Sequence, residues 1–157
     1  MIPVVEPPQL EKDLRLFFGP NAMKFMSLWR ARRLRGKNIG FSFTSFLFPQ
    51  AWLLYRKMYL TAAALTVAPI AIALFFQSTA LSNVTGVTVS ILGGLGPRYY
   101  VDTAEALVIE IRSQSQTDEE ARSTIAEAGG VSRPGAALGF LIFLSTVALA
   151  IVTKHIH

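Results

Sequence analysis

The longest pattern along this chain is an uncharged, mostly apolar stretch, residues 58–97. It contains no Asp, Glu, Lys or Arg, and a short polar segment, Gln77-Ser-Thr-Ala80, separates its two apolar blocks, residues 59–76 and 81–95. A helix rises about 1.5 Å per residue and needs roughly 20 residues to cross the 30 Å hydrocarbon core of a bilayer. The pattern therefore predicts a membrane-spanning hairpin with both ends on one side.

A second uncharged stretch, residues 134–153, lies between Arg133 and Lys154. It predicts a third crossing, so that the expected spans are about 58–76, 80–96 and 135–153. Of the fifteen Lys and Arg residues, only Lys154 follows the third span, so the other fourteen fall on the side of the N-terminus. Because cations collect on the cytoplasmic side of membrane proteins, we expect a cytoplasmic N-terminus and a periplasmic C-terminus.

Small residues recur at four-residue spacing in two of these stretches. They are Gly86, Ser90 and Gly94 in the second block, and Gly135 and Gly139 near the start of the third span. Small residues on one helix face let a second helix approach closely. These five are candidate helix-packing positions, with the alternative that glycine is simply frequent in membrane helices.

The segment before the spans predicts two amphipathic helices. Its first eight residues contain three prolines and predict an extended leader. From Gln9 onward, apolar residues recur with helical spacing until Gly19-Pro20 ends the pattern; they are Leu10, Leu14, Phe17 and Phe18. This face fits either the protein's own core or a lipid surface.

A second helix is predicted from Ala22 to about Leu34. Its apolar face carries Ala22, Phe25, Met26 and Trp29, and its other face and tail carry Lys24, Arg30, Arg32, Arg33, Arg35 and Lys37. Cations beside an aromatic stripe are typical of helices that lie at anionic lipid headgroups. A clustered arginine run also fits nucleic-acid binding. Since positive charge beside a span is the expected topological signal, we expect no nucleic-acid partner.

Residues 41–54 are apolar but too short for an ordinary crossing, and Pro49-Gln50 interrupts them. They form either an interfacial or re-entrant segment, or the first half of a long helix through Tyr59. The long helix places Arg56 and Lys57 inside the membrane, at about 2.5–3.5 kcal/mol each, which favours the interfacial segment. The candidate membrane-interface residues are Trp29, Arg30, Arg32, Arg33, Arg35, Trp52, Tyr55, Arg56, Lys57 and Tyr59.

The segment from Phe41 to Tyr59 contains the motif Trp52-Leu-Leu-Tyr-Arg-Lys-Met-Tyr59. It resembles the Trp-x-x-Tyr-Arg-Lys-Met-Tyr signature of an uncharacterised family of bacterial inner-membrane proteins, classified as domain of unknown function 2628. The chain differs from the family pattern at Ser42, where the family has Asn, and at Pro49-Gln50, where it has a Gly-Pro step. The resemblance implies a small membrane protein and supplies no activity.

The pattern of residues 98–133 predicts a polar, helical segment between the second and third spans. Apolar residues with helical spacing predict a first helix over 98–112, and Thr117-Asp-Glu-Glu120 is a capping box for a second helix that ends at Gly129-Gly130. The acids at the start of the second helix suit its dipole, so we expect neither a metal nor an acid–base pair there. The expected segments are residues 1–57 (cytoplasmic or interfacial helices), 58–97 (transmembrane hairpin), 98–133 (cytoplasmic helices) and 134–157 (last span).

The sequence offers little for catalysis. It has no cysteine, which excludes disulfides and thiolate chemistry, and no nucleophile–base arrangement follows from its spacing. His155 and His157 are expected to be a polar terminus, with a metal or pigment contact as the alternative. We expect no enzyme, no metal and no cofactor.

The expected fold is all-α: an integral membrane protein with three transmembrane helices, N-terminal interfacial helices and a short cytoplasmic helical segment. The expected function is a non-catalytic accessory or scaffold subunit of a larger bacterial inner-membrane assembly (respiratory, photosynthetic or transport). Ion pathways usually need ionisable groups or polar rings inside the membrane. These spans contain no charged residue, and the polar side chains considered are Thr61, Thr66, Thr85, Thr88, Ser90, Ser145 and Thr146. The expected partners are anionic lipid headgroups and membrane-protein subunits. The alternatives are a small oligomeric transporter or channel and a lipid-binding, membrane-shaping protein.

Overall fold

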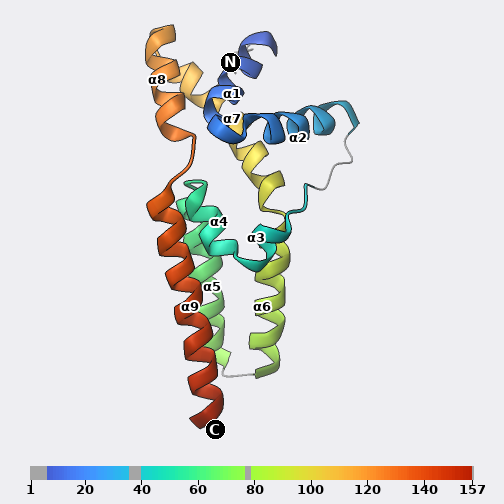
Figure 1. Cartoon of the computed structure of the whole chain (residues 1–157), viewed down its shortest axis with the longest axis vertical. Helices are drawn as coiled ribbons and strands as arrows, with labels where there is room; N and C mark the ends of the chain where they lie inside the picture. Colours follow the sequence, from blue (N-terminus) through green and yellow to red (C-terminus); the bar gives the residue numbers. More distant parts are fainter. Residues whose placement is uncertain (1–6, 36–39, 77–78, 157) are drawn as a thin grey trace. The chain divides into compact units, whose positions relative to one another are not determined.

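The structure is a computed structural model, and it describes residues 7–35, 40–76 and 79–156, which form helices and no strand (Figure 1). In chain order the elements are α1 (Pro7–Phe18), the short 3-10 helix η1 (Gly19–Asn21), α2 (Ala22–Arg35), α3 (Phe43–Leu47), α4 (Pro49–Tyr55), α5 (Tyr59–Phe76), α6 (Thr79–Gly94), α7 (Gly96–Gln114), α8 (Asp118–Ala128) and α9 (Arg133–Ile156). The predicted all-α class is confirmed for this part of the chain.

The helices group into two compact units. The first unit comprises Met1–Gly40 and Pro97–Val131, and the second comprises Phe41–Gly96 and Ser132–His157. Each unit therefore combines two stretches that are far apart in the sequence. The four predicted segments differ from these two units, because the segments divide the chain according to the predicted side of the membrane. The division into four segments stays a prediction.

The first unit packs α1, α2, α7 and α8 around an aromatic cluster. Phe17 and Phe18 of α1 and Phe25 of α2 surround the ring of Tyr100, with centroids 4.9–5.9 Å from it. The predicted apolar faces are buried here, including Leu10, Leu14, Phe17 and Phe18, each 4% exposed or less. Of the two alternatives for the first amphipathic helix, the protein's own core is the one observed.

Local signals fixed most helix boundaries in the first unit. The capping box forms, because the Glu120 backbone N–H donates to Thr117 Oγ1 at 3.2 Å and the Gln116 N–H donates to the Glu120 carboxylate at 2.9 Å. One boundary was wrong: α1 begins at Pro7, although we expected a leader up to Pro8. Proline is tolerated in the first turn of a helix, where its missing N–H has no intrahelical partner to lose.

The second unit contains α5, α6 and α9 together with the short helices α3 and α4. Helix α4 contacts α9, α5 and α6, while α3 packs on α6 (Figure 1). The chain from α4 to α5 is not one long helix, because α4 ends at Tyr55 and Lys57 adopts a left-handed φ of 59°. That break agrees with the preferred alternative for residues 41–54, whose position relative to a membrane stays a prediction.

Candidate functional site

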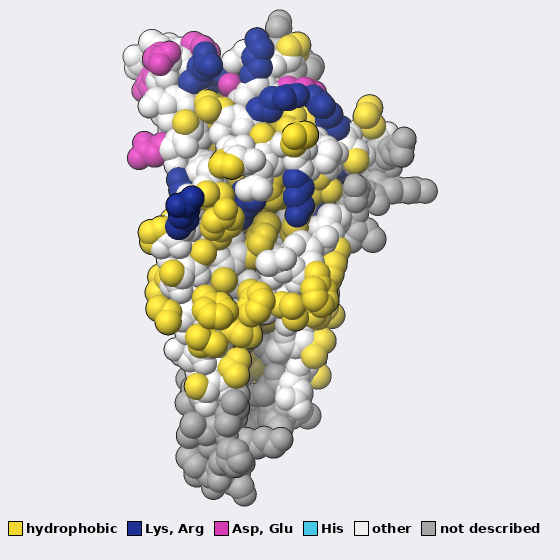
Figure 2. Space-filling view, viewed as in Figure 1, with side chains coloured by type: hydrophobic (Ala, Val, Ile, Leu, Met, Phe, Trp, Pro, Cys, Tyr) yellow, Lys and Arg dark blue, Asp and Glu magenta, His cyan; other side chains and the backbone are white. Residues whose placement is uncertain are grey.

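The second unit exposes large hydrophobic side chains along its three long helices. Figure 2 shows such side chains spread over this face of the molecule. Those on α5, α6 and α9 that are between 41% and 85% exposed are Tyr59, Leu60, Val67, Ile70, Phe75, Phe76, Val84, Val87, Ile91, Leu92, Leu138, Phe140, Leu141, Leu144 and Val147. An apolar surface of this kind marks a membrane or protein contact in most proteins.

By length and composition, one described helix is long and apolar enough to cross a bilayer. The stretch that meets these criteria ends at Ala148 in α9. The apolar stretch Tyr59–Ile72 of α5 is shorter. A single helix of this kind hints at membrane association only weakly. It does not support the three predicted spans, the multi-pass topology or its orientation.

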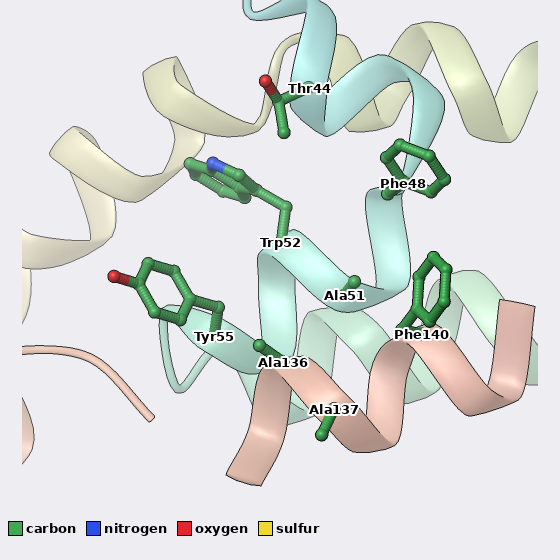
Figure 3. A pocket seen from close by; sticks show the side chains of 8 residues that line it. All are labelled: Thr44, Phe48, Ala51, Trp52, Tyr55, Ala136, Ala137 and Phe140. Atoms are coloured by element: carbon green, nitrogen blue, oxygen red, sulfur yellow. The ribbon is translucent and has the colours of Figure 1, made fainter. Parts of the chain in front are cut away.

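A groove of about 470 Å³ opens within the second unit between α3, α4 and the start of α9. Its lining residues are Thr44, Phe48, Ala51, Trp52, Tyr55, Ala136, Ala137 and Phe140. Figure 3 shows Phe48 and Phe140 facing each other, and Trp52 and Tyr55 bordering the opposite part of the groove. The groove therefore joins two residues of the signature motif to the first turns of α9.

Two glycines bring α9 against α4 beneath this groove. A Cβ on Gly135 would lie 2.5 Å from the Leu54 carbonyl oxygen, and one on Gly139 would collide with the Ala51 backbone. The Ser132 N–H also donates to the Tyr55 carbonyl at 2.8 Å. These two predicted packing positions thus lie where α9 meets α4.

The other three predicted packing positions differ among themselves. A Cβ on Gly94 would collide with the Phe41 ring, whereas a Cβ on Gly86 would meet nothing within 4 Å. Ser90 is half-buried. Since Gly86 faces open space in this chain, its contact with another helix stays a prediction.

The signature motif forms the end of α4 and the turn into α5. Trp52 and Tyr55 line the groove, Arg56 is buried with its guanidinium 5.3 Å from the Tyr55 ring, and Tyr59 is exposed. Lys57 is half-buried at the left-handed position. Their assignment to a membrane interface is a prediction that the fold leaves untested.

The predicted basic cluster of α2 has acidic partners inside the first unit. Arg30 donates to both Glu11 oxygens at 2.5 and 3.2 Å, Arg32 forms an ion pair with Asp102, and Arg33 lies 3.4 Å from Glu105. The hydrogen bond from Arg30 lowers the pKa of the Glu11 carboxyl. Sequence reasoning missed these pairs, because helical periodicity does not reveal which acids on other helices will face α2.

Trp29 is part of the same arrangement. Its ring is 4% exposed, its Nε1–H donates to Glu105 at 2.7 Å, and the Arg33 guanidinium lies 5.0 Å from the ring centroid. This burial leaves the indole little surface for lipid. The side chain of Arg35, the remaining predicted cation, lies outside the described part of the chain.

A buried ion pair joins α1 to α7. Arg112 donates to both oxygens of Asp13 at 2.7 Å and to the carboxylate of Asp118, and Asp13 is 2% exposed. The hydrogen bond to Asp13 raises the pKa of Arg112, and the hydrogen bond from Arg112 lowers the pKa of Asp118. Because these charged groups pair with one another within the unit, the arrangement is structural.

No group of three or more possible metal ligands occurs among the side chains that the structure describes. The backbone of His155 belongs to α9, but its side chain and the whole of His157 are outside the described residues. For these two histidines, a polar terminus therefore stays the prediction, with a metal or pigment contact as the alternative.

Over residues 7–35, 40–76 and 79–156, the fold and its exposed surface define a class: an all-helical protein with one helix that meets the length and composition of a membrane span. The chain belongs to the family described as "Protein of unknown function (DUF2628)", whose profile matches residues 15–113. A search of curated proteins and a search of solved structures gave no match. The predicted family is thereby confirmed, while the bacterial inner membrane and the signature motif stay predictions.

Proposed function

We propose that this protein is a three-span accessory or scaffold subunit of a larger bacterial inner-membrane assembly, with no catalytic role of its own. The observation that carries the proposal is the exposed apolar surface of α5, α6 and α9. In water such a surface would promote aggregation, whereas in lipid or against partner helices it is the expected exterior.

Charge and length support the placement of these helices in a bilayer. Helices α5 and α6 contain no charged residue, and α9 contains only Arg133 and Lys154, near its two ends. Their 18, 16 and 24 residues correspond to about 27, 24 and 36 Å at 1.5 Å per residue. The shortest, α6, needs modest local thinning of the bilayer, which costs fractions of a kcal/mol per Å.

The hydroxyl groups of these helices favour an accessory role over a transporter or channel. Thr66, Thr85 and Thr88 donate to the carbonyl four residues earlier at 2.8 Å, and Thr146 donates to the carbonyl three residues earlier at 2.7 Å. A hydroxyl bound to its own helix is less available to line a polar pathway. A subunit that packs against a partner needs no such pathway.

The ion pairs of α2 bear on the other alternative, a lipid-binding or membrane-shaping protein. Such a role would need Arg30, Arg32 and Arg33 to meet lipid phosphates, yet each has a carboxylate partner in its own unit. If these arginines bound lipid phosphates instead, the three carboxylates would lose their ion-pair partners. We therefore rank this alternative below the accessory subunit.

The proposal is tested by crosslinking in native membranes, followed by purification in mild detergent and mass spectrometry. We expect one membrane protein to copurify in a fixed ratio. Gly86→Trp should lower its recovery, because Gly86 offers open space on α6 for a partner. Val84→Trp is the matched control, since Val84 is also exposed but points about 160° away around the helix. A chain that purifies alone and intact from crosslinked membranes would refute the proposal.

A further inference from the structure

We propose that the groove between α3, α4 and α9 binds one acyl chain of an anionic phospholipid, whose headgroup lies at Arg133. This inference rests on the proposed membrane placement of the second unit and assigns that unit a specific ligand.

The shape of the groove suits a single hydrocarbon chain. Three rings border it, from Phe48 between α3 and α4, Trp52 of α4 and Phe140 of α9, while Ala51 and Ala136 present only methyl groups (Figure 3). Its volume of about 470 Å³ lies within the 300–1,000 Å³ typical of small-ligand sites. A whole helix, about 10–12 Å across with its side chains, is too thick for this space.

The groove is also part of the rigid framework of the unit. The close approach of Gly135 and Gly139 to α4 fixes α9 along its base. At one end Phe48 contacts Phe140 and Phe143, with centroids 5.8 and 5.2 Å apart. The lining is therefore held in place before a ligand arrives, which lowers the entropic cost of binding.

Arg133 lies beyond the lining of the groove, toward the N-terminus of α9. Arg133 is exposed and precedes Ala136, Ala137 and Phe140 at i+3, i+4 and i+7, which is one face of α9. Among the described carboxylates none forms an ion pair with Arg133, and the first turn of α9 contains no acid. The Gly135 N–H is already bound to the Ser132 hydroxyl at 3.0 Å, so at this helix start only the positive end of the dipole adds to the attraction for a phosphate. An exposed cation beside an apolar, ring-lined groove fits an anionic amphiphile.

The test uses Trp52 as a reporter in the purified full chain. Phosphatidylglycerol with brominated acyl chains is titrated into the protein in detergent, because bromine quenches tryptophan fluorescence on contact. The Trp52→Phe variant gives the background from Trp29. We expect quenching of Trp52 to saturate at one lipid per chain, and brominated phosphatidylcholine to bind about fivefold more weakly, the effect of one cation near an anionic headgroup.

Two variants separate the acyl chain from the headgroup. Ala137→Phe should abolish saturable quenching, whereas Ala64→Phe, at an exposed alanine of α5 outside the groove, should leave it unchanged. Arg133→Gln should remove the preference for phosphatidylglycerol, whereas Arg122→Gln, at an exposed arginine of α8, should preserve it. Circular dichroism of each variant checks that the helices remain.

Non-saturating quenching that is equal for both lipids and unaffected by Ala137→Phe would overturn the inference. So would a copurifying protein that is lost in Ala137→Phe while lipid binding persists, because a partner would then occupy the groove. Extraction of the wild-type chain from membranes by alkaline carbonate would instead refute the proposed membrane function. The two failures are therefore distinguishable.

Discussion

Asp13 and Arg112 are separated by 99 positions along the chain, yet they form the most buried ion pair of the first unit. Both oxygens of Asp13 accept hydrogen bonds from the Arg112 guanidinium, and Gln9 adds a weaker bond at 3.3 Å. Bidentate pairs of this kind are the stronger class of charged hydrogen bond. At the scale of single residues, this contact links α1 to α7.

Removal of the Asp13 charge is expected to destabilise the first unit. Asp13→Asn leaves the Arg112 charge with only Asp118 as partner, at an expected cost of about 3 kcal/mol in the free energy of unfolding. Chemical denaturation followed by circular dichroism measures this loss. The control is Glu11→Gln, which breaks an exposed ion pair and should change stability little. Equal losses in the two variants would contradict the structural role of Asp13.

At the scale of elements, the second unit depends on the packing of α9 against the short helix α4. Helix α4 has only seven residues, too few to be stable alone in water. Its contacts with α9, α5 and α6 supply the stability that its own few hydrogen bonds cannot provide. The small residues of α9 permit this contact, because a side chain there would separate the two backbones.

A pair of glycine substitutions separates packing from helix propensity. Gly139→Ala places a methyl group against the Ala51 backbone and should cost about 1–3 kcal/mol. Gly86→Ala meets open space and should stabilise the isolated chain by up to about 1 kcal/mol, since alanine is the better helix former. Unfolding in mixed detergent micelles gives both values. A gain in stability from Gly139→Ala would show that α9 can shift away from α4, and a loss from Gly86→Ala would contradict the open space at that position.

At the scale of the whole molecule, charged contacts and uncharged helices belong to different units. The uncharged helices belong to the second unit, whereas the ion pairs between helices belong to the first. This division of polarity agrees with a lipid-embedded second unit and a water-exposed first unit.

The topology is tested with single cysteines, which the natural chain lacks. With three spans and a cytoplasmic N-terminus, a membrane-impermeant maleimide should label Thr117→Cys in inverted vesicles and His157→Cys in spheroplasts. The unmodified chain is the control for background labelling. Labelling of His157→Cys in sealed inverted vesicles would exclude the three-span arrangement.

The sequence by itself determined the helices, their apolar faces and the family. These follow from local physics: the helical period, the capping box at Thr117 and the stops at Gly19 and Gly129 act over a few residues. It did not determine the partners of Arg30, Arg32 and Arg112, or the groove beside Trp52. Those were decided by tertiary structure, because an ion pair or a groove depends on the rotation and spacing of helices that are distant in the chain. The periodicity of apolar residues within one helix carries no information about the helices that will pack beside it.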